Sequence, residues 1–387
     1  METSNLSSLL SFAYEVEDFR TGNRLYYPCS SIIFMAFMGI LCGGEDWEDI
    51  VEISESGENI LREILGDDFV GVPSHDTFSR FFSLVNPLSL ENAFRKTMSQ
   101  CSMQKNAGSE EKEVIAIDGK YILGVTNESA LNMVSAYATH IGLCLGQEIA
   151  TKKMNEPEAL RKLVRELNIK DSIITADALH CQKESVKEIV QMGGDYLLMV
   201  KSNQKHLYEG ILEGIRTEII RDKKKWIDHA RQTEEGHGRN ETRICHSCSH
   251  PGWLPACGKE WEGIKSYGVI THERTVLATG ETSSETRCFI SSLEKDAPLQ
   301  LTIMREHWKI ENNLHWQLDV SFNEDDAKMN KNQSQNISLL RKLAMPVLKE
   351  FTYKKGTSMK KKMMAAAIKP DIRAKLIQFA ILFYSKS

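Results

Sequence analysis

The sequence predicts an α/β fold in which helices flank a mixed β-sheet and a purely helical domain precedes it. Two observations carry this prediction. Residues 1–100 contain helix-like apolar runs separated by turn clusters, whereas short apolar runs alternate with amphipathic helices from residue 113 onward. Alternating strands and helices indicate parallel pairing, and early strands with no helix between them indicate an antiparallel part.

Length and composition are those of an ordinary globular protein. At ~150 residues per domain, 387 residues correspond to about two to three domains. A content of 41% hydrophobic and 26% charged residues excludes a collagen-like, coiled-coil or wholly disordered chain. The longest apolar stretch, residues 32–42, falls short of the ~20 residues of a membrane span, and the first residues lack the basic region of a secretory signal. We therefore expect a cytoplasmic protein with no membrane partner and with reduced cysteines.

The helical domain is expected over residues 1–100. Ser74 is a suitable N-cap for a helix in which Phe78, Phe81 and Phe82 share one face. The polar residues 101–112 are predicted to form a linker.

The α/β part begins at residue 113 and extends to about residue 350. Strands are expected at 114–117, 132–138, 143–150, 172–176 and 196–200, and helices at 157–167 and 182–192. Residues 201–225 are expected to be helical and 226–296 rich in strands. Helices are predicted again at 298–318 and 335–348.

Charge is distributed unevenly along the chain. Residues 1–100 contain 6 basic and 16 acidic side chains, whereas residues 351–387 contain 9 basic and 1 acidic. The basic C-terminal tail either contacts an anionic polymer or membrane headgroups, or forms a solvated terminal helix.

Three carboxylates stand out as candidate metal ligands. Asp118 and Asp177 each follow an apolar strand run, and Glu311 lies inside a predicted helix. Ligands of α/β sheets bind at the edge where strands end, and carboxylates there can hold a pair of Mg²⁺ ions ~3.5–4 Å apart. Such a pair promotes in-line phosphoryl displacement. The alternative is that the two aspartates only form turns.

Other motifs leave alternatives open. His307, Glu311 and His315 are spaced for one helix face, which suits zinc, or else the histidines position phosphate or pack beside tryptophans. Cys245 and Cys248 lack the second pair of a zinc ribbon, which favours buried thiols. The segment 236–239 either presents His237 and Arg239 to phosphates or is a plain hairpin loop.

Longer motifs follow one another in a fixed order along residues 15–350. They are DFRTGNRLYYP, GVPSHDTFSR, IAIDGK, NMVSAYA, LGQEIATKKMNE, ITADALHCQKE, GGDYLLMVKSNQKHLYE, GHGRNETR and REHWKIENNLHWQLDVSFNEDDAK. On these motifs the chain resembles transposases of the ISAs1 group, relatives of the IS4-type DDE transposases.

The resemblance implies an RNase H-like catalytic domain over residues 113–350, with a β-rich insertion at about 201–297 and a transposase-associated helical domain before it. It implies that Asp118, Asp177 and Glu311 are catalytic and hold two Mg²⁺ ions, for which Mn²⁺ can substitute. The implied substrate is double-stranded DNA, both the terminal inverted repeats of the transposon and the target, bound by a homo-oligomer on paired ends. The implied reaction is water attack at the transposon end, followed by attack of the freed 3′-hydroxyl on target DNA. Candidates for DNA contact or support of the ligands are Lys201, His237, Arg239, Arg305, His307, Asn312 and His315.

Two departures from the pattern of these relatives differ in what they imply. His307 and Leu318 occupy positions where IS4-type relatives often have Arg and Lys, but His-Trp before the Glu is usual in the ISAs1 group, so this departure concerns the subfamily. Residues 327–331 are not Arg-rich as is usual in the ISAs1 group, and this departure allows an alternative. The alternative is a catalytically degenerate, transposase-derived protein that binds DNA or serves in assembly.

Overall fold

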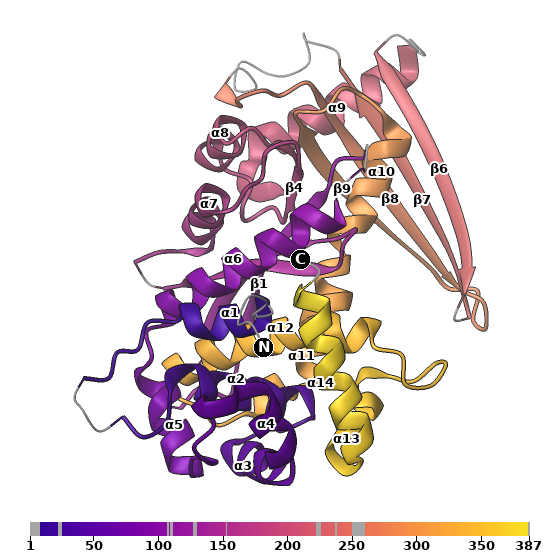
Figure 1. Cartoon of the computed structure of the whole chain (residues 1–387). Coiled ribbons are helices and arrows are strands. Elements are labelled where there is room, and N and C mark those ends of the chain that lie inside the picture. Colours follow the sequence, from indigo (N-terminus) through magenta and orange to yellow (C-terminus); the bar gives the residue numbers. More distant parts are fainter. Residues whose placement is uncertain are drawn as a thin grey trace.

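A computed structural model of the chain describes residues 8–21, 25–106, 108, 111–126, 130–151, 153–221, 226–236, 238–249 and 260–385. Figure 1 shows a helical body at one end and a long sheet whose far strands project away from it. The predicted site residue His237 lies outside the described residues.

The sheet has nine strands in the order β3-β2-β1-β4-β5-β9-β8-β7-β6. Strand β1 runs parallel to β4, and β4 runs parallel to β5, whereas the other neighbours are antiparallel. The first five strands therefore form the RNase H-like mixed sheet that the resemblance implied. The strands are β1 (Val114–Ile122), β2 (Leu131–Ala138), β3 (Leu143–Ala150), β4 (Ile173–Ala176), β5 (Asp195–Val200), β6 (Ile227–Gly236), β7 (Arg239–Cys248), β8 (Ser266–Val276) and β9 (Thr282–Ser291).

The strand-rich segment expected as an insertion continues this sheet. Strand β9 pairs with β5 through Leu197↔Ser291 to Val200↔Cys288, and β8, β7 and β6 follow outward as antiparallel neighbours. Strand β6 forms the edge of the sheet (Figure 1). The segment is thus hydrogen-bonded to β5, the strand that the chain enters after Asp177 and the crossover helix.

Helices cover both faces of the sheet because alternate strand residues point to opposite sides. Val114, Ile173 and Leu197 pack with residues of α10 on one face. Ile115, Ile174 and Leu198 belong to the core on the opposite face. Helices α7, α8 and α9 lie against that second core, which buries the parallel strands from both sides. The helices that flank the sheet are α7 (Glu156–Glu166), α8 (Lys183–Gln191), α9 (Lys205–Arg221) and α10 (Ala297–His307), with the short 3₁₀ turn η2 (Ser202–Gln204).

The helical body is built around α12, whose first turn is closed by a capping box between Asn330 and Gln333. The Asn336 amide donates to the carbonyls of Phe82 and Val85, which fixes α12 to α5. The helices of this body are α1 (Ser8–Glu15), α2 (Cys29–Leu41), α3 (Trp47–Ser56), α4 (Glu58–Leu65), η1 (Gly66–Asp68), α5 (His75–Leu84), α6 (Pro87–Lys105), α12 (Lys331–Glu350), α13 (Met359–Ile368) and α14 (Pro370–Ser385).

Two expectations about the ends of this body need correction. Helix α6 continues to Lys105, so the first five residues of the expected linker 101–112 are helical. The basic C-terminal segment is a packed part of the body, because Tyr384 is fully buried and its hydroxyl donates to the Leu343 carbonyl at 2.6 Å. Arg373, also buried, donates to the Ala366 carbonyl and to Ser56 Oγ, which joins α14 to α13 and α3.

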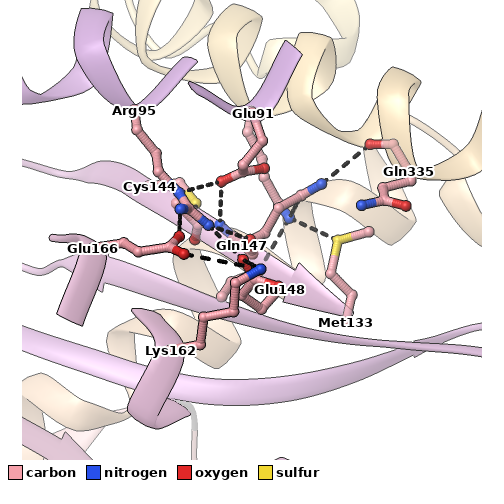
Figure 2. A network of polar contacts seen from close by, with 12 residues as sticks. Glu91, Arg95, Met133, Cys144, Gln147, Glu148, Lys162, Glu166 and Gln335 are labelled. Carbon is pink, nitrogen blue, oxygen red and sulfur yellow. Dashed lines mark hydrogen bonds and ion pairs between the residues drawn. The ribbon is translucent and has the colours of Figure 1, made fainter. Parts of the chain in front are cut away.

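A buried polar network joins the helical body to the sheet (Figure 2). Arg95 of α6 pairs with Glu91 at 2.9 Å, with Glu148 of β3 at 2.7 Å and with Glu166 of α7. Lys162 of α7 adds a second cation, 2.8 Å from Glu148. One network therefore connects α6, β3 and α7 through compensated charges.

Candidate active site

Asp118 and Asp177 stand side by side on neighbouring parallel strands. The pairing of β1 with β4 runs from Val114↔Ile173 to Ile117↔Ala176, so the two aspartates are the next residues on each strand. They share the face of the sheet that α10 covers, because Val114 and Ile173 precede them by four residues and pack with α10. Asp177 follows the end of its strand as predicted. The prediction was wrong for Asp118, because β1 continues to Ile122 in antiparallel pairing with β2.

Glu311 reaches this face from a helix that changes pitch. Helix α10 ends at His307, and Glu311 begins a π-helical turn, η4 (Glu311–His315), which leads into α11 (Trp316–Val320). Single π-turns inside helices occur frequently at functional sites. Glu311 is exposed to solvent, and its negative charge acts on Asp118. The turn thus brings the third predicted carboxylate toward the two aspartates.

Two histidines flank the aspartates, His307 buried and His315 partly buried. His307 Nε2 lies 3.7 Å from Asp177 Oδ1, and its Nδ1 is 3.1 Å from the hydroxyl of Thr175. His315 Nδ1 lies 3.6 Å from Asp118 Oδ2. Each histidine therefore faces a different aspartate. This placement does not support the zinc alternative, in which both histidines and Glu311 would meet at one ion.

The electrostatics of the two aspartates differ. Burial, together with the negative charges of Asp177 and Glu311, raises the pKa of Asp118 to about 6, against the opposing effect of His307. The nearby imidazole of His307 is the main reason that the pKa of Asp177 lies below its usual value, and the charge of Lys201 acts in the same direction. Burial lowers the pKa of His315 to about 3, so this imidazole is neutral at pH 7. The site accordingly gathers negative charge that its own histidines compensate only in part.

The chemistry of these donors fits a hard divalent cation. Carboxylate oxygens are the protein ligands that Mg²⁺ prefers, and a cation would offset both the burial and the neighbouring negative charges that raise the pKa of Asp118. Across the described ranges, no three His, Cys, Asp or Glu side chains already enclose a space for a metal ion. Asp118 and Asp177 bring two such carboxylates together, and Glu311 is exposed near enough for its charge to act on Asp118.

The other predicted residues fall into two groups. Lys201 follows β5 close enough for its charge to act on Asp177, and Asn312 is exposed on the π-turn. Arg239 lies at the far end of β7, opposite Gly236, and the strand pairing puts it about 26 Å along β7 from the level of the aspartates at ~3.3 Å per residue. Arg305 does not reach the aspartates, because its guanidinium pairs with Glu234 at 2.6 Å and donates to Gln232.

Sequence reasoning missed several residues around the aspartates. Thr175, which contacts His307, is the polar residue within the apolar strand β4, two positions before Asp177 and on the same face. Glu156 accepts a hydrogen bond from Asn132 at 2.7 Å, and its other oxygen lies 3.6 Å from His180. Glu156 also borders a cavity of about 800 Å³ beside β1 and the turn after β4. Only the alternation of β4 could have revealed one of these residues, Thr175.

A second charged cluster lies just beyond Asp118. Lys120 Nζ is 2.7 Å from Asp319, 3.2 Å from Glu324 and 3.1 Å from Asp325. Glu324 and Asp325 belong to the 3₁₀ turn η5 (Glu324–Asp326). Strand β1 is therefore fixed to α11 and to the turn after it by ion pairs in which one lysine contacts three acids.

Comparison with known families identifies the class of protein. A sequence model described as "Transposase DDE domain" matches residues 109–346, and one described as "DDE_Tnp_1-associated" matches residues 11–98. The chain therefore belongs to the family of DDE transposases, and the prediction of a DNA transposase is confirmed.

The chain is similar over nearly its whole length to proteins of Escherichia coli. It is 32% identical to "H repeat-associated putative transposase YhhI" of strain K12 over 96% of this chain and 98% of that protein. It is 31% identical to "Putative transposase YncI" of O157:H7 over 94% and 92%. A solved piggyBac transposase synaptic complex with hairpin DNA matches at 12% identity and a TM-score of 0.39, covering 96% of this chain and 76% of that one.

Two further findings concern the chain as a whole. None of the helices that the structure describes is long and apolar enough to cross a bilayer. The eight described cysteines are buried, and no disulfide joins them.

Proposed function

We propose that this transposase belongs to the ISAs1 group and catalyses metal-dependent DNA strand cleavage and strand transfer at the ends of an insertion sequence. In this proposal Asp118, Asp177 and Glu311 are the catalytic residues. The observation that carries it is the register of β1 and β4, which places the two aspartates next to each other on the face that the Glu311 turn covers.

The three carboxylates would hold two Mg²⁺ ions, or Mn²⁺ in their place. Bound there, divalent cations supply charge neutralisation at the phosphate and lower the pKa of an attacking water or hydroxyl. The protein's part is to present the carboxylates in a fixed arrangement. His307 orients Asp177 while its own ring is held by the Thr175 hydroxyl, and His315 lies against Asp118.

Double-stranded DNA is the proposed partner, both as terminal inverted repeats and as target. Lys201 stands beside Asp177 for contact with the reacting phosphate, and the exposed Arg239 lies at the end of the projecting strands for contact farther along the duplex. The mechanism needs two paired ends, so we propose a homo-oligomer. We place the protein in the cytoplasm, where buried reduced cysteines are stable.

The test is cleavage of DNA that carries the inverted repeats flanking the gene, with Mg²⁺ or Mn²⁺. We expect Asp118→Ala to abolish strand cleavage and to leave binding of the transposon end largely intact. The exposed Asp371→Ala is a matched control, because it removes a carboxylate of α14, outside the catalytic site.

Normal cleavage by Asp118→Ala would end the proposal. If the wild-type chain binds the ends but cleaves under none of these conditions, the alternative of a degenerate DNA-binding or assembly protein replaces it. That alternative is favoured by residues 327–331, which are not Arg-rich.

A further inference from the structure

Trp308 occupies the junction at which the Glu311 helix changes pitch. It is the C-cap of α10, and its carbonyl accepts the hydrogen bond from the Asn312 amide at 3.2 Å. The π-turn begins three residues later. Whatever fixes Trp308 therefore fixes the start of the turn that carries Glu311.

The indole ring of Trp308 is held by three neighbouring strands of the projecting part of the sheet. The guanidinium carbon of Arg243 on β7 lies 5.9 Å from the ring, and that of Arg287 on β9 lies 5.1 Å from it. The ring of His272 on β8 is 6.1 Å away. Arg243 pairs with His272, and His272 pairs with Glu285, two residues before Arg287, so all three contacts come from one face of the sheet.

The charges of this cluster are already compensated. Arg243 is buried between Glu234 at 3.2 Å and Glu241 at 2.5 Å, and Arg287 makes two hydrogen bonds to Glu285 at 2.9 and 3.0 Å. The cavity among these side chains measures about 10 Å³, room for at most about one water. A phosphate or a base does not fit there, so the cluster has a structural geometry rather than that of a binding site.

We propose that Trp308 is a positioning residue for Glu311, clamped by Arg243 and Arg287 so that the β6–β9 part of the sheet sets the location of the third carboxylate. This inference rests on the proposed role of Glu311. Each of these ring contacts is modest by itself, but two guanidinium groups and one imidazole ring on three separate strands together fix the position and the rotation of the helix junction. The projecting strands thereby act on the reaction without touching the reacting phosphate.

The test uses the full chain with Trp308→Ala, Trp308→Phe and Arg287→Met. The matched control is Trp47→Ala, which removes a half-buried ring stacked on Phe82 in the helical body. Three quantities are measured: the cleavage rate on inverted-repeat DNA with Mg²⁺, the Kd for that DNA without metal, and amide hydrogen exchange of residues 305–316 without metal or DNA.

We expect Trp308→Ala to lower the cleavage rate roughly 10- to 100-fold, because misplacement by about 1 Å has effects of that size. The Kd for DNA should stay at the wild-type value, and exchange in residues 305–316 should become faster. Trp308→Phe should recover most of the rate, Arg287→Met should lie between, and Trp47→Ala should change neither rate nor local exchange.

Unchanged cleavage and exchange in Trp308→Ala would overturn the inference, and so would a loss of DNA affinity that matches the loss of rate. If Trp308→Ala does not fold, Trp308→Phe and Arg287→Met decide in its place, and wild-type values for Arg287→Met would overturn the clamp. If the wild-type chain itself does not cleave, the proposed function fails, while the exchange measurement still shows whether the clamp exists.

Discussion

Two clusters of three carboxylates border the same sheet, and they differ in how their negative charge is compensated. In the network of Figure 2, Glu91, Glu148 and Glu166 surround Arg95, so the buried acids are compensated within the chain. Around Asp118, Asp177 and Glu311 the described ion pairs include two histidines and neither lysine nor arginine. The negative charge of the first cluster is compensated by cations of the protein itself, whereas the second cluster is suited to bind a cation from solution.

The comparison also separates stability from function. A compensated buried cluster holds elements together, and removing one partner destabilises the fold because a buried charge is then left unpaired. In an uncompensated cluster the carboxylates repel one another, and this repulsion adds to burial, the main cause, in raising the pKa of Asp118 to about 6. Substitutions in the two clusters should therefore change the free energy of unfolding in opposite directions.

The largest effect on stability is expected from Arg95→Met. This change leaves the buried carboxylates of Glu91 and Glu148 without the cation they share, and we expect a loss of about 3–5 kcal/mol in the free energy of unfolding. Urea unfolding measures it. Lys96→Met is the matched control, since its exposed pair with Glu15 contributes about 1 kcal/mol or less. Equal losses in both variants would show that the Figure 2 network has no special role.

How far could the sequence alone have led to this comparison? Strand β3 has the bounds 143–150 that the apolar run predicts, because a buried strand can be recognised in the sequence by its apolar composition. Both aspartates were predicted as a pair, since each follows a buried run. Arg95 and its partners were not, because Glu91, Glu148 and Glu166 are up to 75 residues apart and no local pattern joins them.

Local signals failed where tertiary pairing overrode them. Asp118-Gly119-Lys120 has the composition of a turn, yet antiparallel pairing with β2 continues the strand through it. Strand β6 was not resolved as a separate element, because its mostly exposed edge carries charged residues in place of apolar alternation. No pattern in the sequence indicated the π-turn at Glu311. A regular helix was therefore assumed, and that helix placed Glu311 and both histidines on one face.

A middle-sized effect should come from Mg²⁺ added to the metal-free protein. Ligand binding to the folded state alone stabilises it by about 3 kcal/mol at roughly 100 times the Kd. We expect a higher Tm in the wild type and no response in Asp118→Asn. Calorimetry with and without Mg²⁺ measures this, and an equal response in both proteins would place the cation elsewhere.

The same Asp118→Asn variant should be more stable than the wild type when metal is absent at pH 7.5. The folded-state pKa of Asp118 is raised from 3.8 to about 6, so the favourable protonated form is present at low pH and is lost as pH rises through about 6. The neutral amide avoids that loss, by at most about 3 kcal/mol. Glu235→Gln, at an exposed position of β6, is the control and should show no such gain.

The smallest effect is expected from Gly119→Ala, next to the uncompensated cluster. A Cβ at Gly119 would lie 2.7 Å from Glu156 Oε2, so the Glu156 side chain must swing away and give up its bond from Asn132. Because only the end of a flexible side chain has to move, we expect a loss of about 1 kcal/mol in urea unfolding. Gly236→Ala, whose Cβ would meet nothing within 4 Å, is the matched control.

Gly119→Ala also sharpens the comparison between the clusters. The Gly119 amide donates to the Asp118 carboxylate, so a shifted backbone would alter the site even though stability hardly changes. We therefore expect strand cleavage to fall more than stability does, the reverse of the pattern in Arg95→Met. A variant that loses stability but cleaves at the wild-type rate would mean that Asp118 tolerates displacement. The backbone at Gly119 would then affect stability only, and the contrast between the two clusters would be limited to their side chains.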